Sequence, residues 1–303
     1  MRLKIKVPAT TANMGPGFDS VGMAFQVYNH LEVIADEVDD NPLNKKLTIH
    51  AGDGIPTNEE NLIYQTIADF LTNRGIRIPS LTLRQNDQIP TARGLGSSAA
   101  CIVAGLLAAD ALAETNLPQE ALVNIAARLD GHGDNTTPAI VGGLVVTAIG
   151  SRVEYIQIPA EPWKGLRFAV MIPNFSLLTA EARQALPENY PRQDAVHNIS
   201  RAALLIAAFA TGDYWKLATA LDDRIHQPYR MPLVPNMDAI IAEANKNGAI
   251  GAFLSGAGPT LIAVTEDAGF LPRMDGFLKG LTNRWDIRWV EPDHAGATIE
   301  RVV

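Results

Sequence analysis

Hydrophobic and polar positions alternate with period two at the start of the chain, over residues 2–7 (RLKIKV), which predicts a strand ending at Pro8. Residues 36–46 are acidic and polar, and they are expected to form a hairpin or loop. Residues 139–149 (AIVGGLVVTAI) are expected to be a strand, and AFLSGAGPTLIAV is expected to be two strands around a glycine turn. Further strands are predicted over residues 23–35, 47–51, 81–83, 166–172, 285–290 and 298–303.

Apolar residues recur at helical spacing over residues 61–73, and Gly75 follows as a stop signal. A long alanine-rich helix is predicted directly after the glycine-rich turn at 94–96. Further helices are predicted over residues 118–129, 195–210, 215–225, 237–246 and 270–282. Strands and helices are therefore mixed without strict alternation, which favours an α+β fold with antiparallel or mixed sheets.

The length of 303 residues is sufficient for two packed domains. Gly, Pro and polar residues collect over 151–165, and this predicts a boundary between a domain of residues 1–155 and a domain of residues 156–303. Apolar residues make up 47% of the chain and charged residues 19%, a globular composition.

The net charge of −8, without a cluster of Lys and Arg, argues against a nucleic-acid partner. Cys101 is the single cysteine, so a disulfide within the chain is excluded, and its apolar surroundings indicate a small packed side chain. The N-terminus lacks the apolar core of a signal peptide, and no apolar stretch reaches transmembrane length. We therefore expect a cytoplasmic protein without a membrane partner.

The segment GLGSSAA, residues 94–100, opens the long helix and could hold an anion. The first turn of a helix has free backbone N–H groups, glycines allow close approach, and serines add donors and a metal ligand. The segment lacks the Lys-Ser/Thr of a Walker A loop. It fits the loose dinucleotide pattern, but the polar stretch RQNDQIPTAR stands where a strand should directly precede it. Tight helix packing explains the same small residues equally well.

Three further segments carry candidate chemistry. The first is residues 8–22, PATTANMGPGFDSVG, which could form either a capped loop or the polar wall of a binding site. The second is residues 254–260, LSGAGPT, which could form either a glycine hairpin or a phosphate-binding loop. DGHGDN, residues 130–135, has no standard zinc spacing, and the chain has no G-x-S-x-G nucleophile motif. Asp130 and Asp134 could instead hold Mg²⁺ or orient a hydroxyl group.

Taken in order, PATTANMGPGFDSVG, PTARGLGSSAA and LSGAGPT resemble the three signature motifs of the GHMP kinase family. GFDSVG, HGDNTTPAIVGG, TAEARQALP and HQPYRMPLVP are most similar to segments of its homoserine kinases. The resemblance covers essentially the whole chain. It implies a two-domain α+β fold, with a left-handed βαβ crossover in the first domain and a ferredoxin-like second domain. It also implies transfer of a phosphoryl group from Mg·ATP to the side-chain hydroxyl of L-homoserine.

The resemblance assigns roles on the nucleotide side. Residues 94–100 would wrap the triphosphate, with Ser97 on a phosphate, and Asn61 would contact adenine. Ser98 would ligate Mg²⁺, with Asp130 as the second metal ligand. The family usually has a Glu there, and the shorter Asp130 could act through a bridging water. The implied ATP-binding set is Asn61, Pro90, Arg93, Gly94, Leu95, Gly96, Ser97, Ser98, Ala99 and Ala100.

On the acceptor side, the resemblance places Arg183 and Arg230 on the homoserine carboxylate, and planar guanidinium groups suit that role. Asp19 would hold the ammonium group. Catalysis would rest on Ser98 and Asp134, and our hypothesis is that Asp134 orients the substrate hydroxyl. The implied substrate-binding set is Asn13, Asp19, His132, Asp134, Asn135, Arg183, Arg230, Ser255 and Gly256.

Several alternatives remain open at this point. The acceptor could be that of another GHMP kinase of the mevalonate type, or the activity that of the related diphosphomevalonate decarboxylase. A catalytically silent relative that binds a ligand and regulates a partner is a third possibility, and retention of the serines, Asp134 and both arginines argues against it. The family resemblance is compatible with a homodimer.

Overall fold

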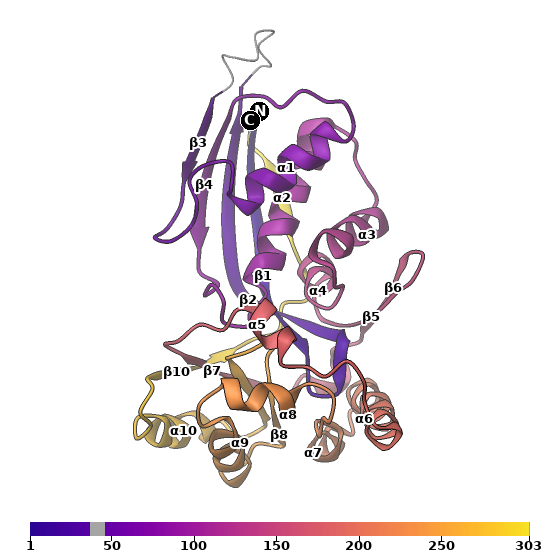
Figure 1. The fold of residues 1–303 in the computed structure, drawn as a ribbon, viewed down its shortest axis with the longest axis vertical. Coiled ribbons are helices and arrows are strands. Elements are labelled where there is room, and N and C mark those ends of the chain that lie inside the picture. The colour runs from indigo at the N-terminus through magenta and orange to yellow at the C-terminus, as the bar shows by residue number, and fades with distance from the viewer. Residues whose placement is uncertain (37–45, 303) are drawn as a thin grey trace.

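The computed structural model describes residues 1–36 and 46–302. The hairpin or loop expected over 36–46 lies, apart from its two end residues, outside the described residues. The chain builds two β-sheets, each covered by helices, and Figure 1 shows the larger sheet with α1–α4 beside it and the smaller sheet below with α8–α10. This is the α+β arrangement expected from the mixed pattern of strands and helices.

The larger sheet has the order β11-β1-β2-β4-β3, with β5 paired to β2 and β6 paired to β5. Among the strands of the described residues in this sheet, only β3 and β4 pair in parallel, and they are connected through α1 (Leu62–Thr72), which gives the expected βαβ unit. Its left-handedness stays a prediction. The strands are β1 (Arg2–Asn13), β2 (Gly17–Ala35), β3 (Leu47–His50), β4 (Leu81–Asp87), β5 (Leu144–Ile149), β6 (Val153–Ile158) and β11 (Thr298–Arg301).

The first strand does not end at Pro8, as we predicted, but runs on to Asn13. Pro8 lies at a shift in the pairing register with β2, where a missing N–H is tolerated. A second shift follows Ala12, and β2 begins at Gly17. Most of the polar segment over residues 8–22 is therefore a β-hairpin with a tight turn, and this brings its polar side chains to one end of the sheet.

The long helix predicted after the glycine-rich turn is α2 (Ser97–Ala113), which packs against α1. Gly105 of α2 lies so close to α1 that a Cβ there would come within 2.7 Å of Thr66 Cβ. Small residues thus let the two helices approach closely. α3 (Gln119–Asp130) agrees with the prediction. α4 (Thr136–Val141) does not, because residues 139–141 were expected to begin a strand and are helical, and the strand β5 starts only after Gly142 and Gly143.

The smaller sheet contains β7 (Arg167–Pro173), β8 (Gly251–Leu254), β9 (Leu261–Thr265) and β10 (Trp285–Val290), in the order β10-β7-β9-β8. All its pairings are antiparallel. Counted along the chain, that is the strand order 4-1-3-2, with helices between the first and second strands and between the third and fourth. This confirms the ferredoxin-like topology expected for the second domain.

Residues on β7 alternate between two hydrophobic clusters. Phe168 and Val170 pack into the large core that also holds the residues of β1, β2 and α2, whereas Ala169 and Met171 face a second core. The second core is closed by α9 (Met237–Lys246) and α10 (Phe270–Leu278). Because one face of the smaller sheet contributes to the main core, the two sheets share one continuous packed interior.

The remaining helices are α5 (Thr179–Gln184), α6 (Arg192–Thr211), α7 (Leu217–Ala220) and α8 (Gln227–Arg230), with 3₁₀ turns over residues 161–163, 214–216 and 231–233. The helix expected over 215–225 is wrong beyond Ala220, because Asp223 and the residues after it form the capped entry to α8. α5 was not predicted. The segment 151–165, expected as a domain boundary, contains β6, which spans residue 155 and pairs with β5. The C-terminal strand β11 pairs with β1 and so belongs to the larger sheet. Within the described residues, no helix has the length and apolar character needed to cross a bilayer.

Candidate active site

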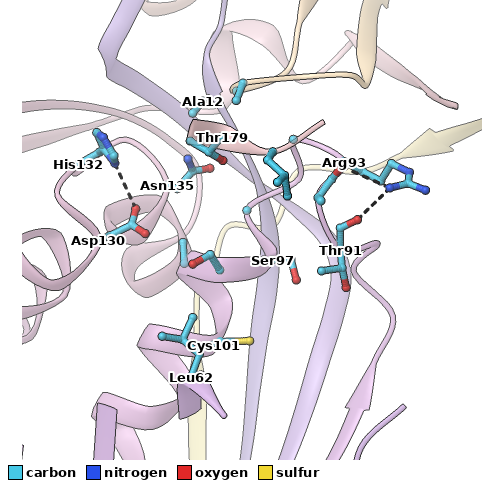
Figure 2. A pocket seen from close by; sticks show the side chains of 18 of the residues that line it. Ala12, Leu62, Thr91, Arg93, Ser97, Cys101, Asp130, His132, Asn135 and Thr179 are labelled. Atoms are coloured by element: carbon cyan, nitrogen blue, oxygen red, sulfur yellow. Dashed lines mark hydrogen bonds and ion pairs between the residues drawn. The ribbon is translucent and has the colours of Figure 1, made fainter. Parts of the chain in front are cut away.

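A cavity of about 550 Å³ lies where the two sheets meet, and both halves of the chain line it. Figure 2 shows Asp130, His132 and Asn135 on one side, Thr91 and Arg93 on the other, Ser97 between them, and Cys101 and Leu62 further along α2 and α1. The cavity contains most of the predicted site residues, and they come from seven separate segments of the sequence. Those that line it are Asn13, Asp19, Asn61, Arg93, Gly94, Gly96, Ser97, Ser98, Ala99, Asp130, His132, Asp134, Asn135, Arg183, Arg230 and Gly256.

The three glycine-containing segments pack directly on one another at this cavity. Asn13 Nδ2 donates to the carbonyl oxygen of Gly256 over 2.8 Å, and the Gly256 N–H donates to Ala12 over 3.0 Å. A Cβ at Gly94 would lie 2.3 Å from the Ser255 carbonyl oxygen. The backbones therefore approach so closely that only glycine fits at residue 94, and each segment fixes the position of the others.

The start of α2 faces the cavity with free donor groups. Gly96 is the N-cap residue in the left-handed region with φ +69°, and it supplies no side chain to cap the helix. Ser97, Ser98 and Ala99 follow and line the cavity, and the helix dipole adds partial positive charge there. The arrangement can hold a polyphosphate with backbone N–H groups and serine hydroxyls.

Four predicted residues do not line the cavity. Leu95 and Ala100 are buried in the main core, and their side chains support the turn from behind. The Ser255 hydroxyl is fully buried, 2.6 Å from the Gly94 carbonyl oxygen and 2.8 Å from Thr11 Oγ1, so it holds the segments together. Pro90 precedes the turn and is not among the lining residues.

Asn61 and Arg93 line the cavity, but much of their hydrogen-bonding capacity is already used. Asn61 is the N-cap of α1, and its Oδ1 accepts from the backbone N–H groups of Ile63 and Tyr64. The Arg93 guanidinium donates to the carbonyl oxygens of Pro173 and Asn174. Arg93 thus ties the glycine turn to the end of β7, which a sequence motif alone does not reveal.

The acidic end of the cavity contains a carboxylate without a partner. Asp134 is 3% exposed, and in the described part of the chain its side chain has no hydrogen bond from another residue and no ion pair. Burial, followed by the charge of Asp19, raises the pKa of Asp134 to about 7. His132 Nδ1 lies 3.8 Å from Asp130 Oδ2, and this acid raises the pKa of the imidazole. Asp134 can therefore change its proton occupancy near neutral pH.

Two arginines from the second half of the chain complete this end. Arg183 of α5 pairs with Asp19 of the first hairpin, Nη2 to Oδ1 at 3.0 Å. Arg230 is 1% exposed and donates through Nε to the Ala182 carbonyl oxygen and through Nη1 to the Gly256 carbonyl oxygen. It has no carboxylate within 4.0 Å in the described ranges, and burial lowers its pKa. The cavity therefore has a buried, unneutralised cation.

Sequence reasoning missed part of the cavity lining. Gln85 and Asp87 point into it from β4, and burial raises the pKa of Asp87. Their spacing of two along a strand was the available signal, but our predicted strand stopped at residue 83. Cys101 also lines the cavity, and burial raises the pKa of its thiol to about 12, so it acts as an apolar surface. Further unpredicted lining residues are Ala12, Gly54, Ile55, Pro56, Glu60, Leu62, Thr91, Ala92, Leu178, Thr179 and Ala257.

The donor set has the character of a magnesium site that a nucleotide completes. Residues 1–36 and 46–302 contain no cluster of three or more His, Cys, Asp or Glu that could hold a metal ion alone. Mg²⁺ in kinases is usually held by one or two protein oxygens together with phosphates and waters. Ser98 is exposed to the cavity and Asp130 lines it, which supplies oxygens of the required type.

Comparison with known proteins identifies the class. Residues 61–143 match the model of the GHMP kinases N terminal domain, and residues 205–269 match the GHMP kinases C terminal model. A solved mevalonate kinase has the same fold, with a TM-score of 0.73 at 14% identity over 96% of this chain and 99% of that one. Together with the full-length relatives below, these matches show that the chain belongs to the GHMP kinase family.

The full-length relatives then indicate which branch of the GHMP kinase family this chain resembles. The chain is 38% identical to a homoserine kinase of Clostridium kluyveri, with 99% of each chain covered. It is 40% identical to a homoserine kinase of Caldicellulosiruptor bescii, covering 98% of this chain and 96% of the relative. The crystal structure of homoserine kinase from Cytophaga hutchinsonii superimposes with a TM-score of 0.86 at 24% identity, covering 99% and 97%.

Proposed function

We propose that this protein transfers the γ-phosphoryl group of Mg·ATP to the side-chain hydroxyl of L-homoserine, giving ADP and O-phospho-L-homoserine. The observation that carries the proposal is the charge pattern at the acceptor end of the cavity. Arg230 is a buried cation without a carboxylate partner in the part of the chain that the structure describes, and Arg183, Asp19 and Asp134 lie around the same space. An amino acid that carries a carboxylate, an ammonium group and a hydroxyl is complementary to this set.

The two ends of the cavity suit the two substrates. The triphosphate would lie on the start of α2 between Gly94 and Ala99, where backbone N–H groups and Ser97 can contact it. The acceptor would lie among Asp19, Asp134 and the arginines. The family's full-length relatives carry the name homoserine kinase, which supports this acceptor over mevalonate. When both substrates are bound in this way, the cavity would hold the homoserine hydroxyl next to the γ-phosphorus of ATP.

The reaction needs one bond to form and one to break. The homoserine hydroxyl oxygen attacks the γ-phosphorus, the bond from that phosphorus to the β,γ-bridging oxygen breaks, and the hydroxyl proton is released. When bound at Ser98 and Asp130, Mg²⁺ would neutralise charge on the phosphates. The chain's own contribution is to align the groups and to donate hydrogen bonds to the phosphoryl oxygens. We propose that Asp134 orients the hydroxyl.

A coupled assay for ADP release tests the proposal. The protein is incubated with Mg·ATP and, in separate reactions, homoserine, mevalonate, galactose, shikimate and serine. ADP release that depends on homoserine alone is the expected result. Turnover only with another acceptor would keep the kinase and overturn the assigned substrate. ATP binding without turnover of any acceptor would favour the silent regulator. A cytoplasmic location, expected from the sequence, and a homodimer, with which the family resemblance is compatible, remain predictions.

A further inference from the structure

Behind the acceptor end of the cavity lies a buried histidine that touches a cavity residue without lining the cavity itself. His226 is 0% exposed and precedes α8. Its Nε2 is 2.7 Å from the Gly15 carbonyl oxygen, and its Nδ1 is 3.2 Å from Arg230 Nη1. The imidazole thus connects the turn of the first hairpin to the buried arginine.

These two contacts require a single tautomer. A carbonyl oxygen only accepts, so Nε2 must carry the hydrogen, and a guanidinium only donates, so Nδ1 must be the acceptor. A protonated imidazole would lose the second contact and would put a positive charge against Arg230. Burial lowers the pKa of His226, which keeps the ring neutral. The structure therefore stabilises the form that can accept from Arg230.

The acidic neighbour of His226 lies beside its Nε2, with Asp223 Oδ2 3.5 Å from that nitrogen, and this is compatible with a hydrogen on Nε2. Asp223 is fully buried, and its Oδ2 accepts from the backbone N–H groups of His226 and Gln227, at 3.0 and 2.6 Å. Its Oδ1 accepts from Asn198 over 2.7 Å. Asp223 thereby fixes the start of α8 and the backbone that carries His226. A buried imidazole needs a partner for each ring nitrogen, and here the partner of Nδ1 is a cavity residue, Arg230.

An aromatic ring confines the same guanidinium from another side. Phe18 stacks on His226 with ring centroids 5.4 Å apart and an angle of 26° between the planes. The Arg230 guanidinium lies 5.4 Å from the Phe18 centroid, and that of Arg183 lies 5.7 Å from it. Both arginines are thus within cation–π distance of one ring. Phe18 and His226 together restrict where the Arg230 plane can lie.

We propose that His226 is a positioning residue for the acceptor carboxylate and acts through Arg230. Nε donates to Ala182 and Nη1 donates to Gly256 and His226, so within the described residues the two N–H groups of Nη2 remain for a ligand. A carboxylate binds a guanidinium best in the plane of its N–H groups, so fixing that plane is equivalent to preforming the site. This inference rests on the proposed function, because it assumes that the carboxylate belongs to homoserine.

Two substitutions separate positioning from packing. His226→Asn places its amide near the original Nδ1 and can still accept from Arg230, whereas His226→Gln places its amide near Nε2 and can still donate to Gly15. We expect the Gln variant to raise the homoserine KM by about tenfold or more, as for loss of one hydrogen bond to a charged group, with the ATP KM unchanged. The Asn variant should stay within about threefold of the parent.

Thermal unfolding of both variants controls for packing. A purely structural histidine would give KM changes that follow the loss of Tm and affect both substrates, and that result would overturn the inference. The Gln substitution is also made in an Arg230→Ala background. If His226 acts through Arg230, its effect on the homoserine KM disappears there, whereas an unchanged effect contradicts the proposal. Turnover of homoserine by the parent protein separates a failure of this inference from a failure of the proposed function. If the parent turns over homoserine but His226→Asn and His226→Gln have the same homoserine KM, this inference alone is overturned. If the parent does not turn over homoserine, the proposed function is overturned with it.

Discussion

Arg183 and Asp19 form an ion pair across the mouth of the cavity, with Nη2 3.0 Å from Oδ1 and 3.3 Å from Oδ2, although 164 positions separate them. Sequence similarity assigned Arg183 to the substrate carboxylate and Asp19 to the substrate ammonium. Each of the two therefore satisfies the other in the absence of the zwitterion that we expect them to bind. Both side chains are more than a third exposed, so the pair itself adds little stability.

Arg183→Ala should therefore affect substrate binding more than folding. Loss of a charge-assisted hydrogen bond to a carboxylate corresponds to about 1.5–3 kcal/mol, so we expect the homoserine KM to rise by about 10- to 100-fold. The ATP KM should change little, because we expect the triphosphate to lie at the start of α2. Steady-state kinetics with each substrate varied in turn measure both values.

Arg93→Ala is the matched control for the loss of an arginine at this cavity. Its guanidinium holds the carbonyl oxygens of Pro173 and Asn174, so its loss should loosen the glycine turn and raise the ATP KM instead. Equal effects of Arg183→Ala on the two KM values would show that Arg183 does not contact the acceptor. The pair of variants thus assigns the two ends of the cavity.

Asp134→Asn tests whether the buried carboxylate orients the hydroxyl or removes its proton. An orienting group can be replaced in part by the amide, so the expected result is a raised homoserine KM and a fall in kcat of about 10- to 100-fold. A fall in kcat of several orders of magnitude, with the homoserine KM and the fold unchanged, would contradict orientation and favour a general base. Circular dichroism of the variant checks the fold.

The same carboxylate should make stability depend on pH in the absence of ligand. The pKa of Asp134 is raised from 3.8 to about 7, so the folded protein holds this proton more tightly than the unfolded chain. The contribution is fully present below pH 3.8 and is lost as pH rises through about 7. Asp134→Asn removes the ionisation, so its Tm relative to the parent should increase between pH 5 and pH 8. Melting curves across that range measure this, and a constant difference would contradict the raised pKa.

Much of the fold and site could be predicted because the motifs combine local and chemical signals. The strong periodicity of residues 61–73 and the glycine turn before Ser97 predicted α1 and α2 where they occur. The sequence could not predict α4, because apolar residues run through both α4 and β5 over 139–149, and only Gly142 and Gly143 separate the helix from the strand. Pro8 was misinterpreted because a register shift, which depends on the partner strand, accommodates it.

The site shows the same division between local and distant information. Similarity of sequence found residues that line the cavity, such as Arg230 and Asp134. It did not indicate that Asn61 is a helix cap, which depends on local backbone geometry. Nor did it indicate that Arg93 binds backbone carbonyl groups, because these belong to a segment far away in the sequence. Phe18 and His226 lie within quoted motifs, yet their contact with Arg230 exists only in three dimensions.

Gly96→Ala should weaken nucleotide binding, and Gly75→Ala provides its control. Both glycines have nearly the same backbone, with φ +69° and +67°, so both substitutions carry the left-handed cost of about 1–2 kcal/mol. Only at residue 96 would the new Cβ collide, 2.0 Å from Thr10 Oγ1, and Thr10 is fully buried and bonded to Asn135 over 2.8 Å. At residue 75 nothing lies within 4 Å. We therefore expect both variants to lose a similar amount of stability from the left-handed backbone. Gly96→Ala alone should lose further stability and show an ATP KM raised by tenfold or more, because its clash must move the start of α2. ATP titration and thermal unfolding of both variants measure this, and equal ATP affinity in the two would place the triphosphate elsewhere.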